Sequence, residues 1–177
     1  MSVVEALKHA CLQNKVILNL HWIDADNFDI EELSSLDGVV VPGGFGYRGI
    51  EGKISAIEFI RKNNIPFLGI CLGLQCAVIE FARNVCGISD ANSSEFSKNS
   101  KNPVIDILPN QNLEKDDIGA SMRLGTYPCK VIPDTHAQEI YGNEIVYERH
   151  RHRYEVNNKY RKDLEASGLV FSGLSPD

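Results

Sequence analysis

Apolar residues recur at two spacings along the first half of the chain. Helical spacing of three or four residues marks three segments, and short apolar runs mark three strand candidates. The helical positions are Val3, Leu7 and Ala10, then Ile50, Ile54, Ile57 and Ile60, then Leu74, Ala77, Val78, Phe81, Ala82 and Val85. The strand candidates are residues 16–23, 38–42 and 66–70. This alternation predicts a doubly wound α/β fold, a mostly parallel sheet flanked by helices, with its active edge at the carboxyl ends of the strands.

The second half has a different pattern, in which polar segments separate short strand candidates. Residues 93–102 and 110–121 are polar and predict loops. The strand candidates are residues 104–108, 127–132, 144–154 and 169–171. A final helix is predicted to be capped by Asn157 or Asn158 and to run through Ala166. We find no repeat and no low-complexity linker, so we expect one domain.

Composition favours a soluble globular protein in a reducing compartment. The chain is 43% hydrophobic, and it contains no apolar run near the roughly 18 residues that span a bilayer. The net charge of −6 argues against general nucleic-acid binding. The five cysteines are odd in number and lack Cys-x-x-Cys spacing, which favours neither a zinc site nor a disulfide framework. We therefore expect a cytoplasmic protein with no bound metal, no nucleic-acid partner and no membrane partner.

One cysteine stands between two glycines at a predicted strand-to-helix joint. Gly69, Cys71 and Gly73 form a Gly-x-Cys-x-Gly pattern, the thiol counterpart of the nucleophile elbow. Glycines allow a tight turn, and the N-terminus of the following helix favours a thiolate. We therefore interpret Cys71 as a nucleophile whose pKa lies below the free-cysteine value of about 8.5. A buried structural cysteine is the alternative.

A glycine-rich loop follows the apolar strand at residues 38–42. Gly44, Gly46 and Gly49 fit the dinucleotide pattern Gly-x-Gly-x-x-Gly, but the acidic residue expected about 20 positions later is missing. We favour another use, in which the N–H groups of Gly44 and Leu72 flank a developing oxyanion. A nucleotide-binding module that uses the Gly44–Gly49 loop is one alternative, and a turn without chemistry is another.

The densest charged segment alternates arginine with histidine. In an extended strand Arg149, Arg151 and Arg153 would share one face. His150 and His152 would share the other face. Three guanidinium groups suit a carboxylate or a phosphate, although a solvated strand edge carries charges for other reasons. Either histidine could act as a base for the nucleophile, and with five histidines in the chain this pairing stays open.

Five segments together resemble the glutamine amidotransferase domain of CTP synthases, which is a class I (triad) domain. They are residues 42–49, 68–75, 90–96, 122–125 and 148–157. The first two segments are shared in outline by class I amidotransferases, whereas the third and fifth are far more specific to CTP synthases. The resemblance covers essentially the whole chain. It implies a flavodoxin-like α/β fold with added short strands in the second half.

The resemblance also implies a glutaminase reaction. Cys71 would attack the side-chain amide of glutamine, release ammonia and leave a γ-glutamyl thioester that water hydrolyses. Matching positions give the glutamine site as Gly44, Leu72, Gln75, Glu95 and Arg153, with Gly44 and Leu72 as the oxyanion donors. The chemistry of free glutamine agrees, because its ammonium suits Glu95 and its carboxylate suits Arg153.

For the intact enzyme, the resemblance implies a ligase of pyrimidine biosynthesis that aminates UTP to CTP. No cofactor is implied for the amidotransferase domain itself, whereas ATP, UTP, Mg²⁺ and the activator GTP are implied for the intact enzyme, along with a synthetase domain and a homotetramer. Residues 1–177 would be a single domain, incomplete at both ends. The histidine and glutamate of the triad would follow residue 177. Another cysteine hydrolase of the same fold, such as a γ-glutamyl peptidase, is the alternative.

Overall fold

The structure is a computed structural model that describes residues 2–107 and 123–176. Its helices are α1 (Ser2–Gln13), η1 (Ile30–Ser35), α2 (Ile50–Lys62), α3 (Leu72–Asn84), α4 (His136–Tyr141), η2 (Asn158–Tyr160) and α5 (Arg161–Ala166), of which η1 and η2 are 3₁₀ helices. Its strands are β1 (Val39–Val41), β2 (Phe67–Gly69), β3 (Ala91–Ser93), β4 (Asn102–Ile107), β5 (Arg123–Val131), β6 (Ile145–His152), β7 (Tyr154–Val156) and β8 (Gly173–Leu174). The predicted loop at 110–121 lies outside the described residues.

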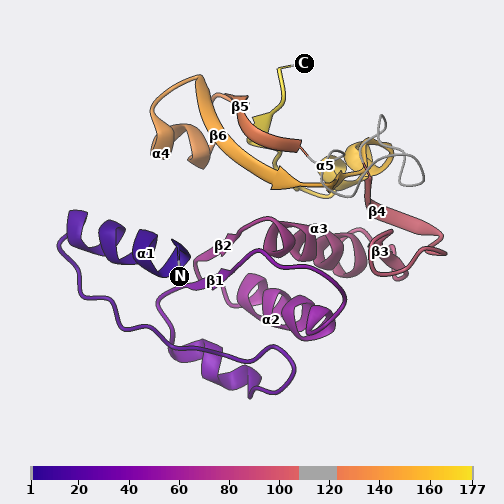
Figure 1. Cartoon of the computed structure of the whole chain (residues 1–177). Helices are drawn as coiled ribbons and strands as arrows, with labels where there is room; N and C mark the ends of the chain where they lie inside the picture. The colour runs from indigo at the N-terminus through magenta and orange to yellow at the C-terminus, as the bar shows by residue number, and fades with distance from the viewer. Residues whose placement is uncertain (1, 108–122, 177) are drawn as a thin grey trace.

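The strands of the described residues form three small sheets. β1 and β2 pair in parallel, with Val40 opposite Leu68. β4 pairs in parallel with β3 and antiparallel with β7. β5 pairs antiparallel with both β6 and β8. Figure 1 shows the β5–β6 ribbon above β2 and α3. The strands of the second half thus lie over the strand–helix units of the first half.

The core lies where α2 and α3 pack against β1 and β2 (Figure 1). Its buried residues from the two helices are Ile50, Ile54, Ile57, Leu72, Cys76, Val78, Ile79 and Ala82. Ile60 of α2 is buried in a second cluster, with Leu33 and Ala56. The four isoleucines of α2 are the positions that periodicity predicted. In α3 the buried face is rotated from the prediction, since Leu74 is 53% exposed while Cys76 and Ile79 are fully buried.

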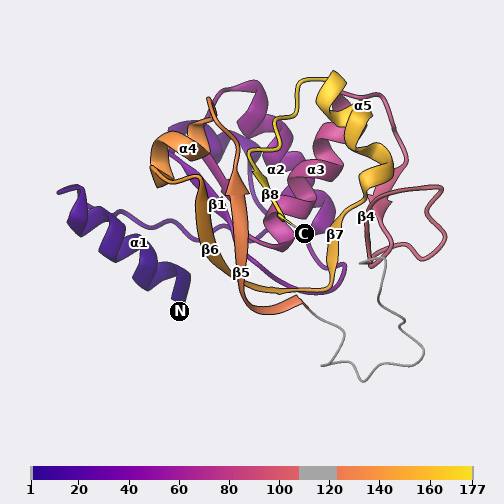
Figure 2. The same ribbon diagram turned by 90° about the horizontal axis from the view of Figure 1, so that it is seen from above.

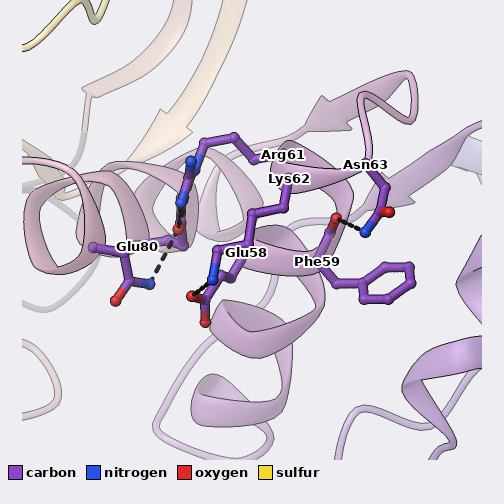
Figure 3. A network of polar contacts seen from close by, with 7 residues as sticks. Glu58, Phe59, Arg61, Lys62, Asn63 and Glu80 are labelled. Atoms are coloured by element: carbon purple, nitrogen blue, oxygen red, sulfur yellow. Dashed lines mark hydrogen bonds and ion pairs between the residues drawn. The ribbon is translucent and has the colours of Figure 1, made fainter.

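A buried carboxylate joins α2 to α3. Glu80 is 1% exposed, and Arg61 donates to both of its oxygens, with Nη2–Oε1 at 2.8 Å and Nε–Oε2 at 3.0 Å (Figure 3). Asn84 donates a further hydrogen bond of 3.1 Å to Glu80 Oε1. An unpaired buried carboxylate is costly, so this ion pair ties the two helices together.

Two strand predictions are wrong. Residues 16–23 form no strand, and Ile17 and Trp22 are largely exposed. A strand needs a neighbouring strand for its hydrogen bonds. Among the described residues β1 pairs with β2, and residues 16–23 pair with no strand. Residues 169–171 form no strand either, because pairing with β5 begins at Gly173.

The predicted terminal helices are both present. At the C-terminal side, the Asn157 side chain caps η2 by accepting from the Lys159 N–H, and α5 then ends at Ala166. At the N-terminal side, α1 forms as its apolar spacing predicts, but none of its residues is buried. Figure 2 shows α1 to one side of the other elements. Its amphipathic pattern therefore predicted the helix without predicting its packing.

Candidate active site

Cys71 lies at a sharp turn between β2 and α3. Its φ of +54° and ψ of −105° are strained for a residue that carries a side chain. The backbones approach closely here: a Cβ on Gly69 would lie 2.7 Å from the Gly73 carbonyl carbon, and a Cβ on Gly73 would lie 2.0 Å from the Val41 oxygen. Both flanking glycines are therefore required by packing. This strained strand-to-helix turn is the geometry of a nucleophile elbow.

The surroundings of the Cys71 thiol raise its pKa, so the expectation of a lowered pKa is wrong. Burial of the thiol has the largest effect and raises the pKa, the Leu72 N–H lowers it, and the charge of Glu95 raises it. The stabilisation that a helix N-terminus gives to a thiolate is therefore outweighed. The Cys71 thiol donates a weak hydrogen bond to the Arg151 carbonyl oxygen, with a sulfur–oxygen distance of 4.0 Å. Chemistry through a thiolate here needs a base.

The glycine loop after β1 lies against the elbow. A Cβ on Gly43 would lie 3.4 Å from the Cys71 Cβ, and a Cβ on Gly44 would lie 3.1 Å from the Leu72 Cδ2. Glycine thus lets the loop approach the nucleophile more closely than a larger residue would. The two residues predicted to donate to an oxyanion, Gly44 and Leu72, are brought side by side.

Glu95 follows β3 and reaches the same loop. The Gly46 N–H donates to its Oε1 at 3.2 Å. Burial raises the pKa of Glu95, whereas the hydrogen bond from Gly46 and the charge of Arg153 lower it. The two charged residues predicted for the glutamine site therefore interact electrostatically. A carboxylate on the loop amide also repels a phosphate, which argues against a nucleotide-binding module.

Arg153 lies at a bend between β6 and β7. Arg149 and Arg151 remain exposed on β6, so the predicted face of three arginines does not form, because the bend takes Arg153 out of the strand. The Gln75 side chain, 7% exposed, donates to the Tyr154 carbonyl oxygen at 3.0 Å. This hydrogen bond holds the bend against the start of α3. The bend that carries Arg153 is therefore held next to the helix that begins at the elbow.

The two histidines of β6 pair with each other. His150 Nδ1 lies 2.7 Å from His152 Nε2, and His152 Nδ1 lies 3.6 Å from Glu155 Oε1. Burial lowers the pKa of His152 to about 4, with smaller lowering effects from His150 and Arg123. Within residues 2–107 and 123–176, no hydrogen bond joins either imidazole to the Cys71 thiol. The geometry gives no support to these histidines as its base.

The turn that carries Glu95 uses residues that sequence reasoning missed. The Ser93 hydroxyl accepts from the Glu95 N–H at 3.1 Å, and the Ser94 hydroxyl donates to Asp106 Oδ1 at 2.6 Å. Such short-range polar contacts follow no hydrophobic period. The two consecutive serines before Glu95 were the available signal, because serine commonly bonds to nearby backbone in turns.

The remaining chemistry of the chain is limited. All five cysteines are free, and burial raises the pKa of Cys76 to about 11. In the described ranges we find no group of three or more His, Cys, Asp and Glu residues that could hold a metal ion. No helix in that part of the chain is long and apolar enough to cross a membrane. Cys71 is set apart from Cys76 by its strained backbone and partial exposure.

Comparison with known proteins explains this arrangement. The family model "Glutamine amidotransferase class-I" matches residues 1–177. The chain belongs to the class I glutamine amidotransferase family. The α/β fold class predicted from the sequence is confirmed, since the amidotransferase match extends over the full chain.

Within the class I amidotransferases, the chain is similar to CTP synthases. CTP synthases of Caldanaerobacter subterraneus subsp. tengcongensis and Carboxydothermus hydrogenoformans are 58% and 56% identical to it over the whole chain, which spans 34% of the length of each. The structure of the Trypanosoma brucei CTPS glutaminase domain with bound acivicin matches with a TM-score of 0.92 and 39% identity, over 98% of this chain and 68% of that one. The resemblance drawn from the motifs is confirmed, and this amidotransferase chain corresponds to the glutaminase domain of CTP synthases.

Proposed function

We propose that this domain, as part of the intact protein, hydrolyses the side-chain amide of glutamine with Cys71 as the nucleophile. The observation that carries the proposal is the strained cysteine at the elbow, with Glu95 and Arg153 interacting beside it. The sulfur bonds to the amide carbon while a base takes the thiol proton. The C–N bond then breaks, and the nitrogen leaves as ammonia after gaining a proton. Water hydrolyses the γ-glutamyl thioester to glutamate and restores the thiol.

Two charged residues would select free glutamine. Glu95 would bind the α-ammonium group of glutamine and Arg153 its α-carboxylate, each through charge-assisted hydrogen bonds. Gln75 supports this arrangement, because it holds the bend that carries Arg153. The N–H groups of Gly44 and Leu72 would bind the oxyanion of the tetrahedral intermediate.

We infer that the base is neither His150 nor His152. Both imidazoles are engaged with each other, and the low pKa of His152 makes it a weak proton acceptor at neutral pH. The raised pKa of Cys71 makes a base necessary for thiolate chemistry. From the resemblance to class I (triad) amidotransferases, we propose that the base is a histidine supported by a glutamate.

We further propose that the ammonia is used to aminate UTP to CTP. The identity of 58% to a CTP synthase supports this step, which requires a synthetase domain, ATP and Mg²⁺ outside the site described above, with GTP as an activator. The same resemblance suggests a homotetramer. The free cysteines favour a cytoplasmic location.

Substitutions in the full-length protein test the proposal. Cys71→Ala should abolish CTP synthesis from glutamine and leave synthesis from added ammonia intact, because ammonia bypasses the glutaminase site. Arg153→Ala should weaken the use of glutamine strongly with the same sparing of ammonia. If Arg153→Ala removed both activities together, its role would be structural and the substrate assignment wrong. Faster hydrolysis of γ-glutamyl peptides than of glutamine would favour the peptidase alternative.

A further inference from the structure

A side-chain hydrogen bond between Ser94 and Asp106 helps to anchor the turn that presents Glu95 to β4. We propose that Ser94 and Asp106 are positioning residues that make the site depend on the α-ammonium group of its ligand. This inference rests on the proposed function, in which the Glu95 carboxylate binds that ammonium. Neither residue is proposed to touch the ligand.

The turn begins at an irregularity between β3 and β4. The pairing register shifts between Asn92 and Ser93, and Ser93 is fully buried. The Ser93 hydroxyl accepts from the Glu95 N–H, while its carbonyl oxygen accepts from the N–H groups of Phe96 at 3.1 Å and Ser97 at 3.0 Å. The register shift changes the direction of the chain, and the hydrogen bonds accepted by Ser93 stabilise the turn that follows.

Ser94 fixes the same turn from the side of β4. Its N–H donates to the Ile105 carbonyl oxygen at 3.0 Å, and its hydroxyl donates to Asp106 Oδ1 at 2.6 Å. That oxygen of Asp106 also accepts from the Ile107 N–H at 2.8 Å. Asp106 is thus held by its own strand, which makes it a rigid anchor for the Ser94 hydroxyl.

The consequence lies at Glu95, one residue further along. Its carboxylate must reach across to the Gly46 N–H and stay near Arg153, and that position depends on the path of the turn. Without the contact to Asp106 the turn would keep its other hydrogen bonds but hold the Glu95 carboxylate less precisely, and an ammonium would have to order that carboxylate on binding. Loss of the anchor should therefore weaken recognition of the ammonium without altering Cys71.

Two thiol reagents that differ in whether they carry an ammonium separate these effects in the full-length protein. Acivicin carries an α-amino acid group, whereas iodoacetamide carries no ammonium. We expect Ser94→Ala to slow inactivation by acivicin about five- to tenfold, within the range for the loss of one ordinary hydrogen bond, and to leave alkylation of Cys71 by iodoacetamide unchanged. Ser94→Thr keeps the hydroxyl and should restore the acivicin rate. Asp106→Ala should match Ser94→Ala, and the double variant should be no slower than either single variant.

The outcomes distinguish this inference from the proposed function. If wild-type Cys71 resists acivicin while reacting with iodoacetamide, the proposed glutamine site itself is wrong. If acivicin modifies the wild type and Ser94→Ala reacts equally fast, the positioning role is wrong. An equal slowing with both reagents would show a general disturbance of the elbow, and it would also overturn the positioning role.

Discussion

The ion pair between α2 and α3 offers the sharpest test of how this fold is held together. Replacing Arg61 with alanine removes the partner of a carboxylate that is almost completely buried. Glu80 would keep the hydrogen bond from Asn84 at 3.1 Å and lose the contacts from Nε and Nη2 of Arg61. We expect the substitution to destabilise the folded chain (Figure 3).

The size of the loss follows from burial. Breaking a fully buried ion pair by removing one partner costs about 3–5 kcal/mol. The Arg61 side chain is 34% exposed, so water can reach part of the space that it leaves and solvate one edge of Glu80. We therefore expect a loss of about 2–3 kcal/mol in the free energy of unfolding, below the range for a fully buried pair.

Urea unfolding of the 177-residue chain, followed by far-UV circular dichroism, measures this loss through the midpoint. Lys62→Ala is the matched control, since Lys62 lies next to Arg61 on α2 and pairs with Glu58 at 2.6 Å near the surface (Figure 3). Such an i,i+4 pair contributes only about 0.3–0.5 kcal/mol. If Arg61→Ala cost no more than Lys62→Ala, the argument from the buried carboxylate would be refuted.

Three other predictions concern the site. Gly73→Ala should cut glutamine-dependent activity at least tenfold, because the new methyl group would collide with the Val41 carbonyl oxygen and displace the elbow; unchanged kinetics would contradict this. The alkylation rate of Cys71 in the ligand-free protein should keep rising with pH beyond the point where a free thiol is already ionised, and a plateau at lower pH would show the opposite shift. The pKa of His152 is about 4 in the folded chain, below its ordinary value of about 6.5, so between these pH values the unfolded chain binds the proton more readily. The folded chain is therefore fully stable with respect to this group above about pH 6.5, and it loses that stability as the pH falls toward 4. His152→Gln should therefore flatten the decline in urea midpoint over that interval, and an unchanged slope would exclude His152 as its source.

The sequence was most informative where one local pattern determines the structure. The isoleucines of α2 lie on one helical face, and that face is the buried one. The glycines around Cys71 predicted the elbow, because so close an approach of β2 and α3 leaves no room for a Cβ. In both cases the cause is contained within about ten consecutive residues.

The predictions failed where the cause lies elsewhere in the chain. The pKa of Cys71 depends on burial and on Glu95, which the helix N-terminus alone does not reveal. Residues 16–23 have strand composition, yet composition supplies no partner strand. The bend at Arg153 is held by Gln75 through the neighbouring Tyr154, which is far away in sequence. Long-range contacts of this kind have no periodic signal.

The contact between Gly73 and Val41 has a consequence for how this domain can change over time. It joins main chain to main chain, so the height of the nucleophile above the sheet is set by atoms that every amino acid shares. Core side chains such as Ile54 and Ile79 can then be exchanged for others of similar volume without moving the sulfur. Substitutions among the core side chains therefore leave the position of the sulfur unchanged. Gly73 itself cannot be substituted in this way, because any side chain would collide with the Val41 backbone.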